Sequence, residues 1–139
     1  MRALSVRQPW AWAIFHAGKD IENRSWRTSH TVGTITVHAS TGVDPLERLP
    51  KGVRCPDRHE LVRSAIIGVV DVVAVVEKSR SRWFYRGQQG WVLRNPRLLR
   101  KPIACSGKLG LWHLPPVVER RIQRQPQRSR PKAHPRGKA

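Results

Sequence analysis

Residues 65–77 read AIIGVVDVVAVVE, which is the longest apolar stretch of the 139-residue chain. Valine and isoleucine dominate it, and both are enriched in strands because branched side chains pack well on a pleated surface. The stretch is apolar at consecutive positions, which is typical of a strand buried on both faces. It is shorter than the roughly 20 apolar residues of a membrane-spanning helix, and Asp71 interrupts it. We therefore predict a long central strand in which Asp71 either finds a partner for its charge or lies where the strand bulges toward solvent.

Shorter elements are predicted on the N-terminal side of this strand. Alternation of apolar and polar residues predicts strands over residues 2–7, 19–26 and 34–40. Pro9 stands where a proline opens a helix at its first turn. Residues at helical spacing give this helix an apolar stripe, namely Trp10, Ala13, Ile14 and Ala17. Gly18 is well placed to end it.

The segment at residues 41–64 is polar and interrupted by proline and glycine, which predicts a crossing loop with one or two short helices. The better of these helices is predicted at residues 57–64, because Asp57 and Glu60 have the spacing of a capping box.

Two closing strands are predicted after the basic, aromatic loop at residues 79–89. They are residues 90–93 and 107–114, separated by a turn at Asn95-Pro96.

The chain changes character after residue 116. Arginine, glutamine, proline and lysine dominate, and hydrophobic residues end, apart from alanine, at Ile122. Such a composition predicts a disordered basic tail over residues 117–139, with a helical stub at most at residues 117–125.

The whole pattern indicates an α+β fold. Five or six strands with two or three flanking helices, and no regular strand–helix alternation, predict a small β-barrel. The length suffices for one hydrophobic core. We therefore expect a barrel domain over residues 1–116 and the tail over residues 117–139.

Charge is the most unusual property of the composition. Lys and Arg number 27 against nine Asp and Glu, which gives a formal net charge of +18. Residues 117–139 hold eight basic residues and one acidic residue, so about +11 remains on residues 1–116. A chain with this charge attracts polyanions, and nucleic acid is the expected partner.

The sequence favours a cytoplasmic location. The N-terminus has no apolar segment of the kind found in signal peptides, and two cysteines do not form a disulfide framework. Cys55, His59, Cys105 and His113 are the residues from which a zinc site would have to be built. Because their spacing falls outside the common zinc patterns, we predict neither a metal nor a cofactor, and we infer no membrane and no obligate protein partner.

The densest cluster of chemically capable side chains lies at residues 19–26. On a strand, Glu22, Arg24 and Trp26 share one face, and Lys19 stands at its entrance. A carboxylate beside a guanidinium stays ionised and accepts a hydrogen bond from an amino group, such as the exocyclic amine of a base. The alternative is a solvated strand edge with one surface ion pair.

A second candidate is the loop at residues 79–86, in which arginines alternate with aromatic residues. Arg82 and Trp83 form its central pair. Single-stranded nucleic acids are bound by such loops, because bases stack on the rings while guanidinium groups contact phosphates. The alternative is that these aromatic side chains plug one end of the barrel.

Several motifs resemble the ASCH domain family. They are Leu4-Ser5-Val6-Arg7-Gln8-Pro9-Trp10-Ala11, the spacing of Lys19, Glu22 and Arg24 after Gly18, Ile67–Asp71, Asn95-Pro96-Arg97 and Gly107–Trp112. The resemblance covers about residues 1–116. It implies a PUA-like β-barrel and RNA binding.

The resemblance also implies a ligand groove beside the barrel. Carried onto this chain, the groove is lined by Arg7, Gln8, Pro9, Trp10, Lys19, Glu22 and Arg24. Trp26 joins these residues because it shares the strand face. His38, on the polar face of the third strand, is a further candidate as an acid or base beside Glu22. The alternative, which we favour for His38, is a hydrogen-bonded histidine of the barrel with no catalytic duty.

An enzyme is the alternative function. The resemblance implies that some relatives are enzymes: one is an amidohydrolase that acts on an acetylated cytidine nucleoside, and another is a ribonuclease. If this chain is an enzyme, Lys19 and Glu22 would be its acid and base groups. The amidohydrolase has a nucleophilic threonine three residues after its lysine, where this chain has Glu22, so the same covalent chemistry is not expected.

The partner classes also remain open at this point. RNA is the preferred partner, and DNA is possible because phosphate contacts do not distinguish the two. A third alternative is an adaptor whose basic tail docks on an acidic protein.

Overall fold

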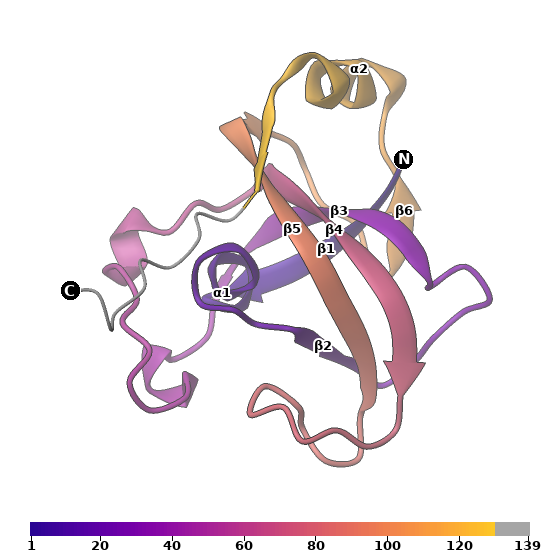
Figure 1. Ribbon diagram of the computed structural model, residues 1–139. Coiled ribbons are helices and arrows are strands. Elements are labelled where there is room, and N and C mark those ends of the chain that lie inside the picture. Colours follow the sequence, from indigo (N-terminus) through magenta and orange to yellow (C-terminus); the bar gives the residue numbers. More distant parts are fainter. Residues whose placement is uncertain (130–139) are drawn as a thin grey trace, which may run out of the picture.

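The apolar stretch forms β4 (Ala65–Val76), which lies in the middle of the sheet as predicted. The structure is a computed structural model that describes residues 1–129 (Figure 1). The remaining elements are β1 (Arg2–Gln8), α1 (Trp10–His16), β2 (Ile21–Arg24), β3 (Gly33–Val43), β5 (Gln89–Ala104), β6 (Leu111–His113), α2 (Pro116–Arg124), β7 (Gln127–Ser129) and two short 3-10 helices, Leu46–Arg48 and Arg58–Glu60. No helix within residues 1–129 has the length and apolar character needed to cross a membrane.

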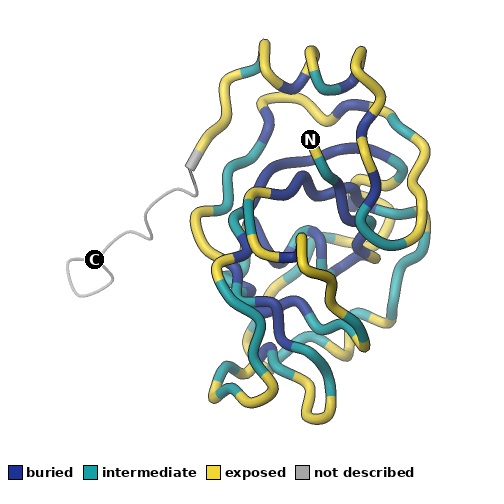
Figure 2. The backbone as a smooth tube through the Cα atoms, turned by 90° about the vertical axis from the view of Figure 1, so that its right-hand side faces the viewer, coloured by how far each residue is buried: buried dark blue, intermediate teal, exposed yellow. Residues whose placement is uncertain are grey.

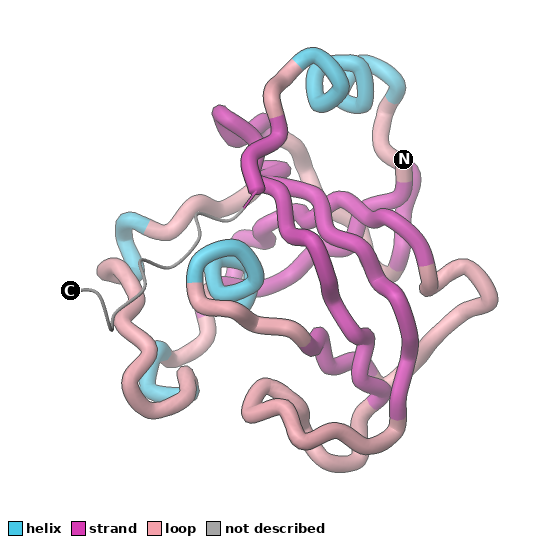
Figure 3. Tube along the Cα trace, in the orientation of Figure 1, coloured by secondary structure: helices cyan, strands magenta, loops and turns pink. Residues whose placement is uncertain are grey.

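Within the described residues, the strands form one seven-stranded sheet in the order β2-β5-β4-β3-β1-β6, with β7 also paired to β5. β1 and β3 are parallel, and every other pair is antiparallel. The chain returns from β1 to β3 through α1 and β2, and α1 lies beside the strands in Figure 3.

The predicted barrel is wrong in one respect, because the sheet does not close. β2 and β6 are its two ends and do not pair with each other. β6 has only three residues and pairs with Arg2, Ala3 and Leu4, so the edge of β1 from Ser5 onward has no strand partner on that side. There Arg24 of β2 reaches across and donates to the Ser5 carbonyl. A side chain thus stands where a closed barrel would have a ladder of backbone hydrogen bonds.

The predicted turn at Asn95-Pro96 is also wrong, because β5 continues through it for 16 residues. Val69 pairs with Arg97 and Asp71 with Arg94, so two residues of β5 lie opposite Val70 alone. This is a β-bulge, and it accommodates both the missing N–H of Pro96 and the positive φ of Asn95, 55°. The same bulge brings Arg97 to Asp71 as a partner for its charge.

The prediction of disorder is wrong for residues 117–129. The helical stub forms α2, and Val118 and Ile122 on its inner side pack with Ile103, Trp112 and other residues of the sheet. After it, β7 pairs with β5. The predicted disorder of residues 130–139 lies outside the described residues.

α1 covers one face of the sheet, and its position depends on a glycine of β4. Phe15 of α1 is buried against that face. A Cβ atom at Gly68 would lie 2.5 Å from the Phe15 ring and 2.6 Å from the Arg97 carbonyl, so only glycine admits this contact. Figure 2 shows the buried residues gathered in the interior of the molecule, with exposed residues around them.

The second 3-10 helix differs in its cap from the sequence prediction. Asp57 caps it by accepting from the backbone N–H of His59, whereas the predicted capping box requires the N–H of Glu60.

Candidate functional site

Lys19, Glu22 and Arg24 come together, as their spacing predicted. Lys19 Nζ lies 3.1 Å from Glu22 Oε1 and also donates to the Ile21 carbonyl. Arg24 holds the other carboxylate oxygen, with both Nε and Nη2 at 2.9 Å from Oε2. Arg24 Nη2 donates as well to the Ser5 carbonyl at 2.9 Å. The carboxylate is therefore fixed between an ammonium and a guanidinium.

This cluster is buried, although β2 is an edge strand. Lys19 is 4% exposed and Glu22 7%, which excludes the alternative of a solvated surface ion pair. Burial alone would raise the pKa of Glu22, but the charges of Lys19 and Arg24 and their hydrogen bonds outweigh it and hold the pKa below its ordinary value. Glu22 is therefore a carboxylate at neutral pH.

A cavity of about 290 Å³ opens beside this cluster, between the free edge of β1 and β2. Its lining residues come from five segments of the chain and are Ser5, Val6, Arg7, Trp10, Lys19, Glu22, Asn23, Arg24, Asp44, Tyr85 and Gln88. The unclosed seam of the sheet is thus where the cavity lies.

A second carboxylate organises the other wall of this cavity. Asp44 accepts from Arg7 Nε at 2.7 Å and from Trp10 Nε1 at 2.8 Å. Burial raises the pKa of Asp44, and the bonds from Trp10 and Arg7 outweigh this effect, so the pKa lies below its ordinary value. Trp10 is thereby held with its ring edge-on to Tyr85, with the centroids 6.3 Å apart.

The loop at residues 79–88 is fastened to β2 by hydrogen bonds. Asn23 Nδ2 donates to the Trp83 carbonyl at 2.7 Å, and Asn23 Oδ1 accepts from the Tyr85 N–H at 2.8 Å. These bonds turn Trp83 inward, where it is 5% exposed and packs with Ala13 and Ile21. Tyr85 faces the cavity and is 49% exposed.

Of the predicted site residues, five line the cavity: Arg7, Trp10, Lys19, Glu22 and Arg24. Two others, Gln8 and Pro9, are buried outside it. Gln8 accepts from the N–H of Trp12 and donates to the Val62 carbonyl, and Pro9 precedes the first turn of α1. Their role is to position the segment that carries Arg7 and Trp10.

The remaining four predicted residues lie elsewhere. Trp26 packs edge-on against the buried Trp91 at 5.1 Å and lines a different depression. Trp83 is a core residue, with the exposed Arg82 over its ring at 5.4 Å. The alternative, in which the loop aromatics close one end of the sheet, therefore describes Trp83 better than base stacking does.

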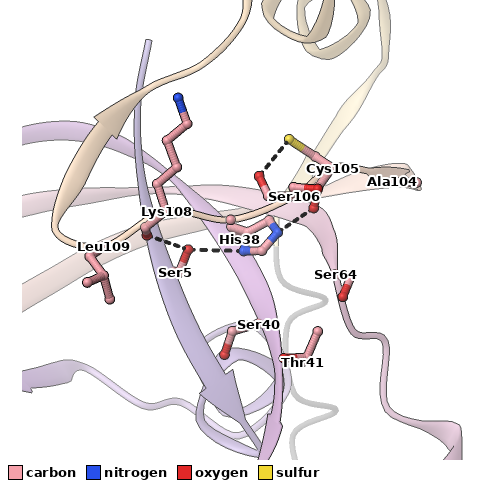
Figure 4. Close-up of a pocket in the computed structure, with 11 residues that line it drawn as sticks. Ser5, His38, Ser40, Thr41, Ser64, Ala104, Cys105, Ser106, Lys108 and Leu109 are labelled. Carbon is pink, nitrogen blue, oxygen red and sulfur yellow. Dashed lines mark hydrogen bonds between the residues drawn. The ribbon is translucent and has the colours of Figure 1, made fainter.

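The hydrogen bonds of the His38 ring go to Ser5 and Cys105, and neither involves Glu22. Nδ1 of the ring lies 3.1 Å from Ser5 Oγ, and Nε2 lies 2.6 Å from the Cys105 carbonyl (Figure 4). Burial lowers the pKa of His38, and the bond to Cys105 opposes this effect only in part. The ring is therefore neutral at pH 7, with Nε2 carrying the proton that a carbonyl requires.

Sequence reasoning missed Ser5, Asn23, Asp44, Tyr85 and Gln88 as residues at this cavity. Tyr85 lies in the aromatic loop that the sequence singled out. Which residue of this loop faces the cavity depends on hydrogen bonds to Asn23, which is more than 60 residues away in the sequence. No local pattern marks Asp44.

The family model of the ASCH domain matches residues 4–103, which include every residue at the cavity. The chain belongs to the ASCH domain family. This family is part of the PUA-like superfamily. A comparison with curated proteins gave no match. Three elements of the described residues, β6, α2 and β7, follow the matched segment of the ASCH domain, and β6 and β7 join the sheet.

Proposed function

We propose that this ASCH domain binds single-stranded RNA by taking one base into the cavity between β1 and β2. The observation that carries the proposal is the ionised, buried Glu22 carboxylate held between Lys19 and Arg24 at the wall of this cavity. Membership of a PUA-like family is consistent with RNA as the partner.

The wall of the cavity suits the edge of a base. Arg24 and Asn23 offer N–H donors for ring nitrogens and carbonyl oxygens, and the carboxylate of Glu22 accepts from an exocyclic amine. These groups are fixed before the ligand arrives, so little conformational entropy is lost on binding.

The mouth of the cavity suits the face of a base. Trp10 and Tyr85 stand there, and the ring of Tyr85 is half exposed. An aromatic ring contributes about 1–3 kcal/mol per stacked base. The cavity volume of about 290 Å³ is at the small end for ligand sites, which favours one base over a stacked run.

The electrostatics favour binding over acid–base catalysis. A general acid at neutral pH needs a raised pKa, whereas the pKa of Glu22 is lowered. Lys19 contacts Oε1 of Glu22, and Arg24 contacts Oε2 through two nitrogens, so the carboxylate keeps a lone pair on Oε1 that can accept a hydrogen bond but has no proton to donate. We also propose a cytoplasmic location. Cys55 and Cys105 are both unpaired thiols, which fits a reducing compartment.

The test is the affinity for a single-stranded RNA of eight nucleotides, measured by fluorescence anisotropy. Tyr85→Ala removes the exposed ring, and we expect roughly 5- to 100-fold weaker binding if one base stacks on it. Arg24→Gln removes a donor from the wall and is expected to weaken binding by at least about tenfold.

The matched control is Arg82→Gln, which removes the same charge from an exposed site outside the cavity. A loss equal to that of Arg24→Gln would show that only net charge matters and would refute the base site. If the protein turns over the RNA or an acetylated cytidine, and Glu22→Gln abolishes this turnover, the protein is an enzyme and the proposal of a binding module is wrong. Urea unfolding of each variant separates loss of the site from loss of the fold.

A further inference from the structure

A second and larger cavity, of about 740 Å³, also has Ser5 in its lining (Figure 4). Its lining residues are Ser5, His38, Ser40, Thr41, Ser64, Ala104, Cys105, Ser106, Gly107, Lys108 and Leu109. None of the functional groups at its mouth takes part in the site described above, apart from Ser5, which lines both cavities.

Ser5 joins the two cavities through different atoms. Its carbonyl oxygen accepts from Arg24, which belongs to the first cavity, while its hydroxyl lies 3.1 Å from Nδ1 of His38 in the second. Trp112 Nε1 also donates to the Ser5 hydroxyl at 3.3 Å. The two cavities are therefore neighbours that share Ser5 in their linings.

The floor of the second cavity is rigid. The carbonyl of Cys105 and the hydroxyl of Ser5 hold the His38 ring from both sides. The loop after β5 lies directly on this pair, since a Cβ atom at Gly107 would come within 2.6 Å of the ring and 2.7 Å of the Ser5 hydroxyl. The same loop presents the exposed Lys108 at the rim.

The walls of this second cavity carry several hydroxyl groups. Ser40 Oγ is buried and has no hydrogen-bond partner among the described residues. Ser64 points to the cavity from a left-handed backbone conformation, with φ 55°, that few residues other than glycine adopt. Thr41 and Ser106 add two further hydroxyls at the exposed rim.

We infer that this cavity binds the sugar and phosphate of the nucleotide next to the base held in the first cavity, and that it selects ribose over deoxyribose. A ribose 2′-hydroxyl is both a donor and an acceptor, and the unpartnered hydroxyl of Ser40 has the same two capacities. Lys108 supplies the cation for the adjoining phosphate. The inference rests on the proposed function, because a base in the first cavity determines where the chain runs.

The experiment compares the dinucleotides ApA, CpC, GpG and UpU with their deoxyribose counterparts, using calorimetry at constant salt on the full chain. We expect the ribose form of the preferred sequence to bind roughly 3- to 10-fold tighter, the effect of one added hydrogen bond. Ser40→Ala should bring this ratio close to one and leave the affinity for the deoxyribose form unchanged. Lys108→Gln should weaken both forms about equally.

Lys78→Gln is the control for Lys108→Gln, since Lys78 is exposed and lines neither cavity. A ratio near one in the wild-type protein, or a ratio that Ser40→Ala leaves unchanged, overturns the inference. The proposed function survives that result if a mononucleoside still binds and Arg24→Gln abolishes the binding. If no mononucleoside and no dinucleotide binds at all, the proposed function fails, and the inference fails with it.

Discussion

His38 illustrates how burial changes the chemistry of a single residue. It is 2% exposed, and both ring nitrogens are engaged by Ser5 and Cys105. The sequence left two roles open for His38, an acid or base beside Glu22 and, as the favoured alternative, a hydrogen-bonded histidine without a catalytic duty. The hydrogen bonds of the ring fit the second role, in which it joins β3 to the loop after β5. The lowered pKa makes this role dependent on pH.

We predict that His38 makes the protein less stable as the pH falls below 6.5, the ordinary pKa of histidine. In that range the unfolded chain binds a proton at this position and the folded chain does not, so stability decreases with falling pH. The slope contributed by one such group is at most about 1.4 kcal/mol per pH unit. Urea unfolding between pH 7.5 and 5.0 measures it.

The slope between pH 6.5 and 5.0 should become shallower in His38→Gln. His30→Gln is the control, because His30 is exposed. An equal slope in His38→Gln and in the wild-type protein would contradict this prediction. The paired carboxylates of Glu22, Asp44 and Asp71 do not affect the slope in this pH range. Their pKa values are lowered, so their contribution to the free energy of unfolding is lost only at more acidic pH.

At the scale of elements, α2 shows how a basic segment becomes part of a core. Val118 and Ile122 are one helical turn apart and face the sheet, while Arg120, Arg121 and Arg124 face solvent. The N-terminal ammonium of Met1 lies 2.6 Å from Glu119 and holds the start of the chain to this helix. The overall composition of this segment is basic and polar, so a prediction from composition overlooked the two apolar residues that pack on the sheet.

We predict that Ile122→Ala lowers the free energy of unfolding by roughly 2–4 kcal/mol, because Ile122 is fully buried and the cavity left behind closes only in part. Arg124→Ala, on the exposed side of the same helix, should change it by less than about 0.5 kcal/mol. Chemical denaturation of both variants gives the comparison. Equal and small effects would mean that α2 is dispensable to the fold.

At the scale of the whole molecule, the net charge of +18 acts on any polyanion before a site is engaged. It gives affinity without selectivity, since phosphate contacts carry no information on sequence. Under the proposed function, selectivity depends on the two cavities, which are lined by few exposed cations.

We predict that the affinity for the eight-nucleotide RNA decreases steeply with salt, with a slope of log K against log salt of about −3 if four or more phosphates are contacted. The affinity for an uncharged nucleoside, which has no phosphate, should barely change over the same range of 50 to 300 mM. Anisotropy titrations for the RNA and calorimetry for the nucleoside provide the two slopes. A flat response for the RNA would exclude the electrostatic contribution.

Much of the local structure was predictable. The valine-rich run of β4, the helical stripe of α1 and the common face of Glu22 and Arg24 follow from backbone periodicity, which is a property of the chain itself. The sequence could not separate Tyr85, which lines the cavity, from Trp83, which is buried, because the orientation of that loop depends on Asn23 of β2. The turn predicted at Asn95-Pro96 was wrong because a proline is tolerated at a bulge, and a bulge exists only once β4 lies beside β5.

The sequence by itself determined the charge, the central strand, the first helix and the order of Lys19, Glu22 and Arg24 along one ribbon of backbone. Only the tertiary structure decided that the sheet stays open beside Ser5, that two cavities share this residue in their linings, one of them at the open seam, and that α2 joins the core. The reason is physical. Periodicity acts between residues a few positions apart, whereas cavities and buried faces arise from contacts between segments that the chain keeps far apart until it folds.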